Sequence, residues 1–144
     1  MNWSFVSKER FPPMAGTEER PDADLSAIRT VAKQQALQWV GLAIRARKAV
    51  IGADAVMKAV QSRKARLVLV TEDAGANMAK KYRDKCAFYD IPLVVWFDRW
   101  ELGIACGKPQ TVAVAFMDPG FAAKMEKYYG EFSGGEAFGE TSSV

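Results

Sequence analysis

Apolar residues along the chain recur at two spacings, one typical of helices and the other typical of strands. Apolar positions three or four residues apart predict helices at 24–45, 54–62, 77–89, 98–106 and 118–128. Continuous apolar runs predict short strands at 48–51, 66–71, 92–97 and 111–117. Unbroken runs of this kind are typical of strands that other elements cover on both faces. The pattern therefore predicts five helices and four buried strands in alternating order.

The alternating order indicates an α/β protein. Short strands separated by helices build one sheet with helices on both faces, so we expect a three-layer α/β/α sandwich with a four-stranded mixed sheet. Local signals agree with the predicted helix ends: Asp98 is a good N-cap, Gly107 fits the position after a helix, and Pro119 fits a first helical turn. Gly103 lies inside a predicted helix, which indicates a position of close packing.

The two ends of the chain differ in composition from its middle. Residues 1–33 contain several prolines and scattered charges, and we expect a largely flexible leader whose last part extends the first helix. Residues 130–144 are rich in Gly, Ser and Glu, and we expect a disordered acidic tail. The α/β/α domain is then predicted to span residues 34–129, a length that suits a single core.

Missing residue types restrict the chemistry that the chain offers. It has 144 residues and no histidine, which removes the commonest acid–base group and the commonest metal ligand. Cys86 and Cys106 lack metal-binding spacing, and we expect them to be buried free thiols. No apolar stretch is long enough to span a membrane, and the start does not resemble a signal peptide. We therefore expect a cytoplasmic protein without a metal, a cofactor or a membrane partner.

Charge is distributed unevenly along the chain. Residues 34–129 contain fifteen Lys and Arg against nine Asp and Glu, whereas the last fifteen residues contain three acids and no base. A basic domain beside an acidic tail indicates a polyanionic partner, most simply RNA. An ordinary solvated surface is the alternative interpretation of the same charges.

Glu72 and Asp73 follow the second predicted strand, where carboxylates often take part in catalysis or metal binding. Adjacent residues of a strand point to opposite faces, so this pair does not converge on one ligand. We therefore expect one of the two to cap the following helix rather than to act in catalysis.

Basic residues surround the start of the second predicted helix. The glycine and the two residues after it, 52–54, would form a helix N-terminus whose free amides suit phosphate or a carbonyl edge. The predicted RNA-binding residues here are Arg45, Arg47, Lys48, Gly52, Ala53, Asp54 and Lys58. Arg45, Arg47 and Lys48, at the end of the first predicted helix, would also complement a helix C-terminus, and both roles stay open.

Residues 37–127 contain four ordered motifs: Leu-Ala-x-Arg-Ala-x-Lys, Gly-x-x-x-Val-x-Lys-Ala, Glu-Leu-Gly-x-x-x-Gly-Lys and Asp-Pro-Gly-Phe-Ala. With these motifs the chain resembles the bacterial branch of the L-seven-Ae ribosomal protein family. The resemblance implies the three-layer fold. It also implies a partner among structured RNAs, because many relatives bind kink-turn RNA, and an association with the ribosome or with translation factors.

The kink-turn signature of such relatives, Gly-Ala/Thr-Asn-Glu-x-x-Lys, is matched only in part. Gly52, Ala53 and Lys58 agree, whereas Asp54 replaces Asn and Ala55 replaces Glu. An ionised Asp accepts hydrogen bonds without donating any, and Ala offers no polar group to a base edge. These departures weaken the case for kink-turn specificity.

The second contact region of relatives is the loop after the third strand, here Val95-Trp96-Phe97-Asp98-Arg99-Trp100. Its rings would stack on splayed bases or pack in the core. With Val95, Trp96, Phe97 and Arg99 added to the predicted site, we expect a non-catalytic RNA-binding protein. The alternative is a protein-interaction module of the same fold that has lost specific RNA recognition.

Overall fold

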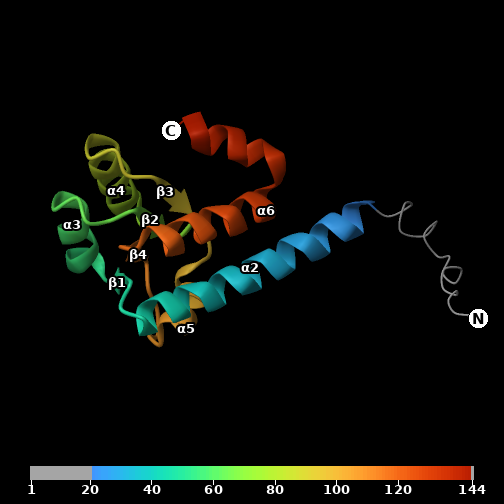
Figure 1. Cartoon of the computed structure of the whole chain (residues 1–144), viewed down its shortest axis with the longest axis horizontal. Coiled ribbons are helices and arrows are strands. Elements are labelled where there is room, and N and C mark those ends of the chain that lie inside the picture. The colour runs from blue at the N-terminus through green and yellow to red at the C-terminus, as the bar shows by residue number, and fades with distance from the viewer. Residues whose placement is uncertain (1–20, 144) are drawn as a thin grey trace, which may run out of the picture.

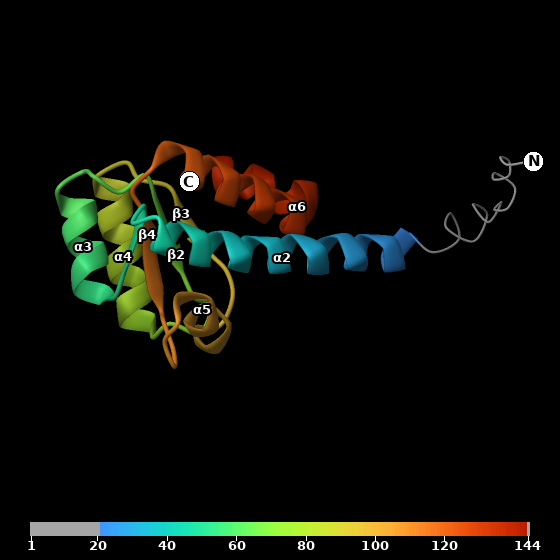
Figure 2. The ribbon, with the colours of Figure 1, turned by 60° about the horizontal axis from the view of Figure 1, so that its bottom comes forward.

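The structure, a computed structural model, describes residues 21–143 (Figure 1). Five helices alternate with four strands, as predicted, in the order α2 (Pro21–Arg45), β1 (Ala49–Ile51), α3 (Ala53–Gln61), β2 (Leu67–Val70), α4 (Ala76–Phe88), β3 (Leu93–Val95), α5 (Arg99–Cys106), β4 (Ala113–Phe116) and α6 (Pro119–Ser143). The N-terminal half of α2 extends away from the sheet, and α6 lies beside α2 (Figures 1 and 2).

The four strands form one mixed sheet in the order β1-β4-β2-β3. Strand β3 runs parallel to β2, while β4 is antiparallel to both β1 and β2. Helices α3 and α4 cover one face, and α2, α5 and α6 cover the other (Figure 2). The predicted three-layer α/β/α sandwich with a four-stranded mixed sheet is therefore confirmed.

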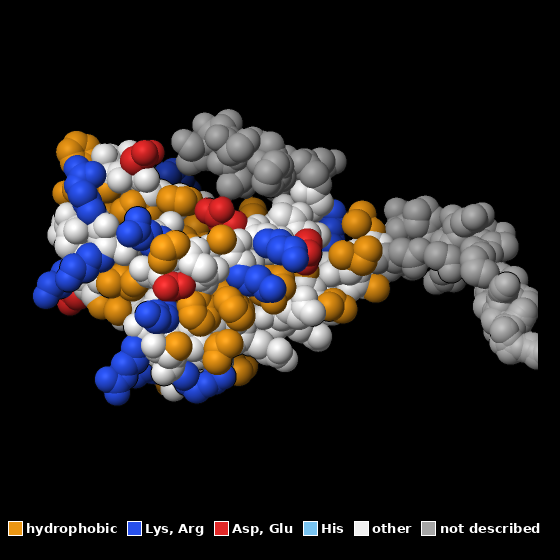
Figure 3. Space-filling view, viewed as in Figure 1, with side chains coloured by type: hydrophobic (Ala, Val, Ile, Leu, Met, Phe, Trp, Pro, Cys, Tyr) orange, Lys and Arg blue, Asp and Glu red, His pale blue; other side chains and the backbone are white. Residues whose placement is uncertain are grey.

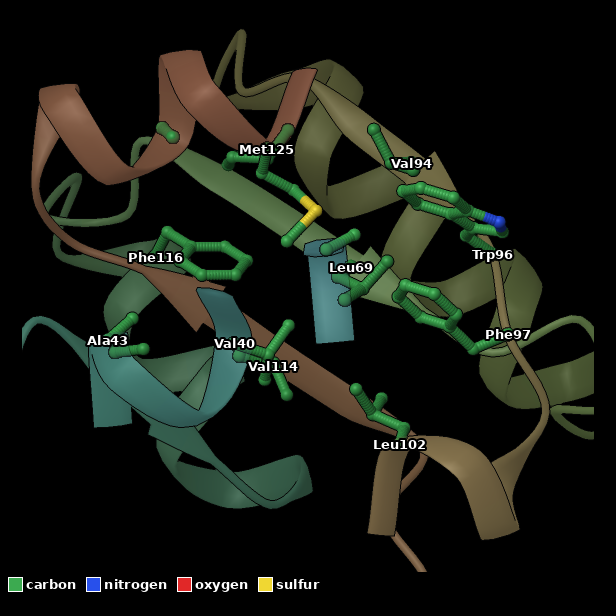
Figure 4. Packing of buried hydrophobic residues seen from close by; sticks show 14 residues of the cluster. Val40, Ala43, Leu69, Val94, Trp96, Phe97, Leu102, Val114, Phe116 and Met125 are labelled. Atoms are coloured by element: carbon green, nitrogen blue, oxygen red, sulfur yellow. The ribbon is translucent and has the colours of Figure 1, made fainter. Parts of the chain in front are cut away.

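The central strands β2 and β4 are buried along their whole length. Leu67 and Leu69 face α2, α5 and α6, as Figure 4 shows for Leu69. Val68 and Val70 point the other way, toward α3 and α4. Because side chains alternate across a strand, an unbroken apolar run fills the core on both faces at once.

Local capping signals determine where the later helices begin and end. The Asp98 carboxylate accepts a hydrogen bond from the Glu101 amide (2.8 Å), and the Glu101 carboxylate accepts one from the Asp98 amide (3.0 Å), which completes a capping box. Gly107 ends α5 at a φ of 74°. Helix α6 begins at Pro119 after Asp118, whose carboxylate accepts from the Phe121 amide (3.1 Å). The predicted roles of Asp98, Gly107 and Pro119 are confirmed.

The last helix continues further than the predicted end near residue 128. Helix α6 runs to Ser143, with a break in helical geometry at Gly134 (φ 73°). The Phe132 ring lies 4.9 Å from the Trp96 ring, so the core holds this part of the helix in place. Composition alone did not reveal that contact.

The flexible leader was predicted over residues 1–33, of which 1–20 lie outside the described residues. The division of the chain at 33 and 129 stays a prediction.

The two cysteines are free, as expected, but they differ in exposure. Cys86 is buried and Cys106 is half-buried. Burial raises the pKa of each thiol to about 11, so both are protonated at neutral pH and are weak nucleophiles. None of the described helices combines the length and the apolar character that crossing a membrane requires.

A substitution at Gly103 tests the close packing that the sequence predicts there. A methyl group on Gly103 would lie 2.6 Å from the Gln110 Cα and 2.9 Å from the Lys108 carbonyl oxygen. We expect Gly103→Ala to lower the free energy of unfolding by about 1–3 kcal/mol in urea denaturation, because backbone atoms must move. Gly75→Ala is the matched control, since its added methyl group meets no atom within 4 Å. Equal stability of the two variants would contradict the assignment.

Candidate functional site

A groove opens at the edge of the sheet where β1 ends and β4 begins. It encloses about 430 Å³ and is lined by Ile51, Gly52, Ala53, Met78, Tyr82, Lys108 and residues 110–113. A second hollow of about 210 Å³ shares Ala53, Met78 and Tyr82 with the first and adds Asp54, Met57, Asn77 and Lys81. From here on, the groove means the first hollow and the second hollow together. Its walls are mostly apolar, and Lys81 and Lys108 supply positive charge.

The N-terminus of α3 forms one wall of the groove. Gly52 has a φ of 97°, which favours glycine, and a side chain here would meet no atom within 4 Å. No side chain caps this helix, and residues 52–55 are all exposed. The first amides of α3 are therefore directed to solvent at the positive end of a helix dipole, where they can bind phosphate or a carbonyl oxygen.

Tyr82 connects the α3 wall with α4. Its hydroxyl donates a hydrogen bond to the Ala53 carbonyl oxygen at 3.4 Å. Burial, followed by the negative charge of Asp54, raises the pKa of Tyr82 above its ordinary value. The hydroxyl therefore remains protonated and keeps this hydrogen bond at neutral pH.

Asp73 does not cap α4, and neither does Glu72, so this prediction was wrong. The N-cap of α4 is Gly75, without a side-chain hydrogen bond. The Asp73 carboxylate instead accepts hydrogen bonds from the Arg99 amide (3.1 Å) and the Arg99 Nε (3.3 Å). It thereby joins the end of β2 to the start of α5. The partner is 26 residues away, which is why local helix-capping rules did not find it.

Arg99 is held in place by several contacts beyond Asp73. Its guanidinium donates to the Asp73 carbonyl oxygen (2.7 Å) and to the Gln110 side chain (3.4 Å). Because Gln110 also lines the groove, Arg99 lies next to it in this network. A phosphate that approached Arg99 would compete with these partners.

The Asp73 carboxyl titrates below its ordinary range. Burial alone would raise its pKa, but hydrogen bonds and the Arg99 charge outweigh that effect and lower the pKa. A lowered pKa in the folded state means that ionised Asp73 favours folding above its unfolded pKa. This contribution is lost as pH falls through the folded-state value.

The aromatic loop after β3 packs into the core. Trp96 and Phe97 are each 1% exposed, and their rings stack on each other at 4.3 Å (Figure 4). Tyr129 and Phe132 of α6 also contact the Trp96 ring. Base stacking on these two rings is therefore at odds with the structure, and the core alternative is the one it adopts. Val95, in contrast, is partly exposed.

The structure also separates residues that the sequence placed in one site. Arg45, Arg47 and Lys48 precede β1, whereas Gly52 follows it. The two groups therefore lie at opposite ends of this strand. Lys58 is exposed on α3, and Ala53 and Asp54 line the groove. The prediction missed Lys81, Lys108 and Gln110 of the groove lining. The basic outer face of α4 was a signal for Lys81, whereas no local signal marked Gln110.

Comparison with known proteins identifies the family. The sequence model of the ribosomal protein L7Ae/L30e/S12e/Gadd45 family matches residues 34–126. The chain belongs to this family. It is 47% identical over 92 residues to the RNA-binding protein YlxQ of Bacillus subtilis (strain 168), which covers 62% of this chain and 92% of that protein. The RNA-binding protein YlxQ of Enterococcus faecium is 35% identical over 95 residues, or 66% and 91% of the two chains.

Solved structures share the fold of this family member. One from Bacillus halodurans C, described as a protein with unknown function, superposes with a TM-score of 0.63 at 41% identity and covers 65% of this chain and 94% of that one. The Giardia lamblia 15.5kD RNA binding protein superposes with a TM-score of 0.60 at 20% identity, covering 71% and 88%. The second likeness concerns the fold alone.

Substitution of two tryptophans tests whether the loop packs or is free to stack. Trp96→Ala should lower the free energy of unfolding by about 3–5 kcal/mol, because it leaves a cavity in the core. Trp100→Ala should change it by less than about 0.5 kcal/mol, because Trp100 is 56% exposed on α5. Urea denaturation measures both. A stable Trp96→Ala protein would show that the loop does not need its core contacts.

Proposed function

We propose that this protein is a non-catalytic RNA-binding protein that binds structured RNA at the groove. The observation that carries the proposal is the uncapped, exposed start of α3, which lies beside a mostly apolar hollow with two lysines in its lining. Support comes from the family and from two relatives that are named RNA-binding proteins.

Each part of the groove matches a part of an RNA. The amides of residues 53–55 are donors for phosphate oxygens or base carbonyls. The apolar walls formed by Ile51, Met78 and Tyr82 provide space for a base that is splayed out of its helix. Lys81 and Lys108 offer positive charge to the backbone. Figure 3 shows Lys and Arg side chains among hydrophobic ones on the part of the molecule that contains the sheet, away from the N-terminal half of α2.

The titratable groups are arranged for structure rather than for turnover. Both thiols are protonated at neutral pH, and Asp73 is engaged with Arg99. In the described part of the chain, no three Cys, Asp or Glu side chains gather closely enough to hold a metal ion. The protonated thiols and the engaged Asp73 support a binding role rather than a catalytic one.

We further propose that the protein associates with the ribosome or with translation in the cytoplasm. Its recognition of kink-turn-like RNA is weaker than that of relatives with the full signature. Asp54 and Ala55 are exposed at the start of α3, where a base edge would lie, and neither donates a side-chain hydrogen bond. A protein-interaction role is the second candidate. Trp100 and Ile104 favour it, because they are 56% and 79% exposed, one turn apart on α5.

Restoring the relatives' signature tests kink-turn recognition. We expect the natural protein to bind a kink-turn RNA and a plain duplex of similar length with nearly equal affinity. The double variant Asp54→Asn/Ala55→Glu should gain about 5- to 150-fold in preference for the kink-turn, the value of one good bidentate base contact. Titrations of both proteins with both RNAs measure the preference. Tight and selective kink-turn binding by the natural protein would overturn our interpretation of these two positions.

Lysine substitutions test the placement of the site. Lys58→Ala, Lys81→Ala and Lys108→Ala should each weaken binding to all RNAs and reduce the salt dependence of log affinity by about one unit for each lost phosphate contact. Lys127→Ala is the control, because this exposed residue lies on α6, which packs against the other face of the sheet. The natural protein is titrated at two salt concentrations beside the variants. Failure of the natural protein to bind any RNA at low salt would favour the protein-interaction role.

A further inference from the structure

Six basic residues gather at the edge of the sheet opposite to the groove. They lie at the end of helix α2 and in the segments that follow α2 and α3, and we call them the basic edge: Arg45, Arg47, Lys48, Arg63, Lys64 and Arg66. All six are exposed. They come from two segments that are separated in the sequence and that resemble each other in structure.

The turns after α2 and α3 have the same backbone geometry. Arg47 and Arg63 each adopt a φ of 62°, in the left-handed region. The amides of these arginines donate to Ile44 and Val60, and the lysines that follow them donate to Ala43 and Ala59, with all four distances between 2.8 and 3.0 Å. This is the Schellman arrangement, in which glycine usually occupies the left-handed position. Here an arginine stands at that position in both turns.

Strand β4 holds the two turns side by side. The Met117 amide donates to the Lys48 carbonyl oxygen (2.8 Å), and the Arg66 amide donates to the Phe116 carbonyl oxygen (2.7 Å). The two basic segments therefore flank the end of one strand, and their backbones are about 10 Å apart, which is two strand spacings.

The positive charge of this edge is largely uncompensated. Among the described residues, none of the six forms an ion pair, although the Arg63 guanidinium lies over the Tyr89 ring at 5.1 Å. Asp90, which follows Tyr89, is exposed and is the acidic residue next to this contact. The Asp118 carboxylate nearby accepts the Phe121 amide at the start of α6. Two helix C-termini carry about half a negative charge each, so six cations exceed what these dipoles can offset.

The turn after α4 has the same geometry with Asp90 at the left-handed position (φ 60°), so what sets the turns after α2 and α3 apart is that both carry arginine there. Glycine adopts this conformation without steric cost, whereas arginine is strained there. Both turns would form as well or better with glycine. The chain nevertheless places arginine in each, followed in each by lysine.

We propose that the basic edge is a second RNA-contacting surface that binds the phosphate backbone of a duplex. Long, flexible cations without base-reading amides contact phosphates and give affinity without sequence preference. Because the groove lies at the other end of the strands, one protein molecule would then contact two separate segments of RNA. This inference rests on the proposed RNA-binding function and extends it to a second site.

Glycine substitutions provide the test, because they remove charge at positions where the backbone favours glycine. The full-length Arg47→Gly/Arg63→Gly variant should unfold at the same temperature as the natural protein or higher. Its affinity for a plain RNA duplex at low salt should fall by about tenfold, and the salt dependence of log affinity should fall by about two units. The control Arg29→Ala/Lys127→Ala removes two exposed charges, on the N-terminal half of α2 and on α6, and should change the salt dependence by less than half as much.

The outcomes separate this inference from the proposed function. If the natural protein binds RNA and the double glycine variant binds duplex with unchanged affinity and salt dependence, the basic edge is not a contact surface, while the groove remains. If the control variant loses as much affinity as the glycine variant, net charge explains the effect and the second site is overturned. If the natural protein binds no RNA at all, the proposed function fails together with it.

Discussion

The pairing of β2 with β4 is the interaction on which the rest of the molecule depends. Leu67–Val70 and Ala113–Phe116 are buried on both faces and hold the two helical layers together. The ends of the same strands define the two surfaces of interest. The groove opens where β4 begins, and the basic edge flanks the residues where β4 ends.

Features encoded by neighbouring residues were predictable from the sequence. Unbroken apolar runs identified the strands, and the N-cap residue Asp98 identified the start of α5, because both signals act over a few positions. Features that depend on distant partners were not predictable in this way. Asp73 bonds to Arg99, and Phe132 packs on Trp96, across 26 and 36 positions of the sequence. Composition and capping rules do not contain these contacts.

The candidate site shows the same division between local and distant signals. The start of α3 was found because glycine followed by a helix is a local pattern. Arg45 to Lys48 were grouped with it because they are close in sequence, yet the three residues of β1 carry them to the other edge. Lys108 and Gln110 join the groove through the fold of the loop before β4. A sequence motif therefore identifies residues that are close along the chain, whereas the strand order of the sheet determines which residues are close in space.

The central place of β4 has a consequence for how the chain assembles during synthesis. β4 is the last strand to be made, yet β1 pairs with it alone within the described sheet. The first strand must therefore wait, unpaired, until more than sixty further residues have emerged from the ribosome. Late closure of a central strand makes folding slow and leaves an edge open to wrong partners. A chain with this strand order completes its sheet only when nearly the whole domain is available.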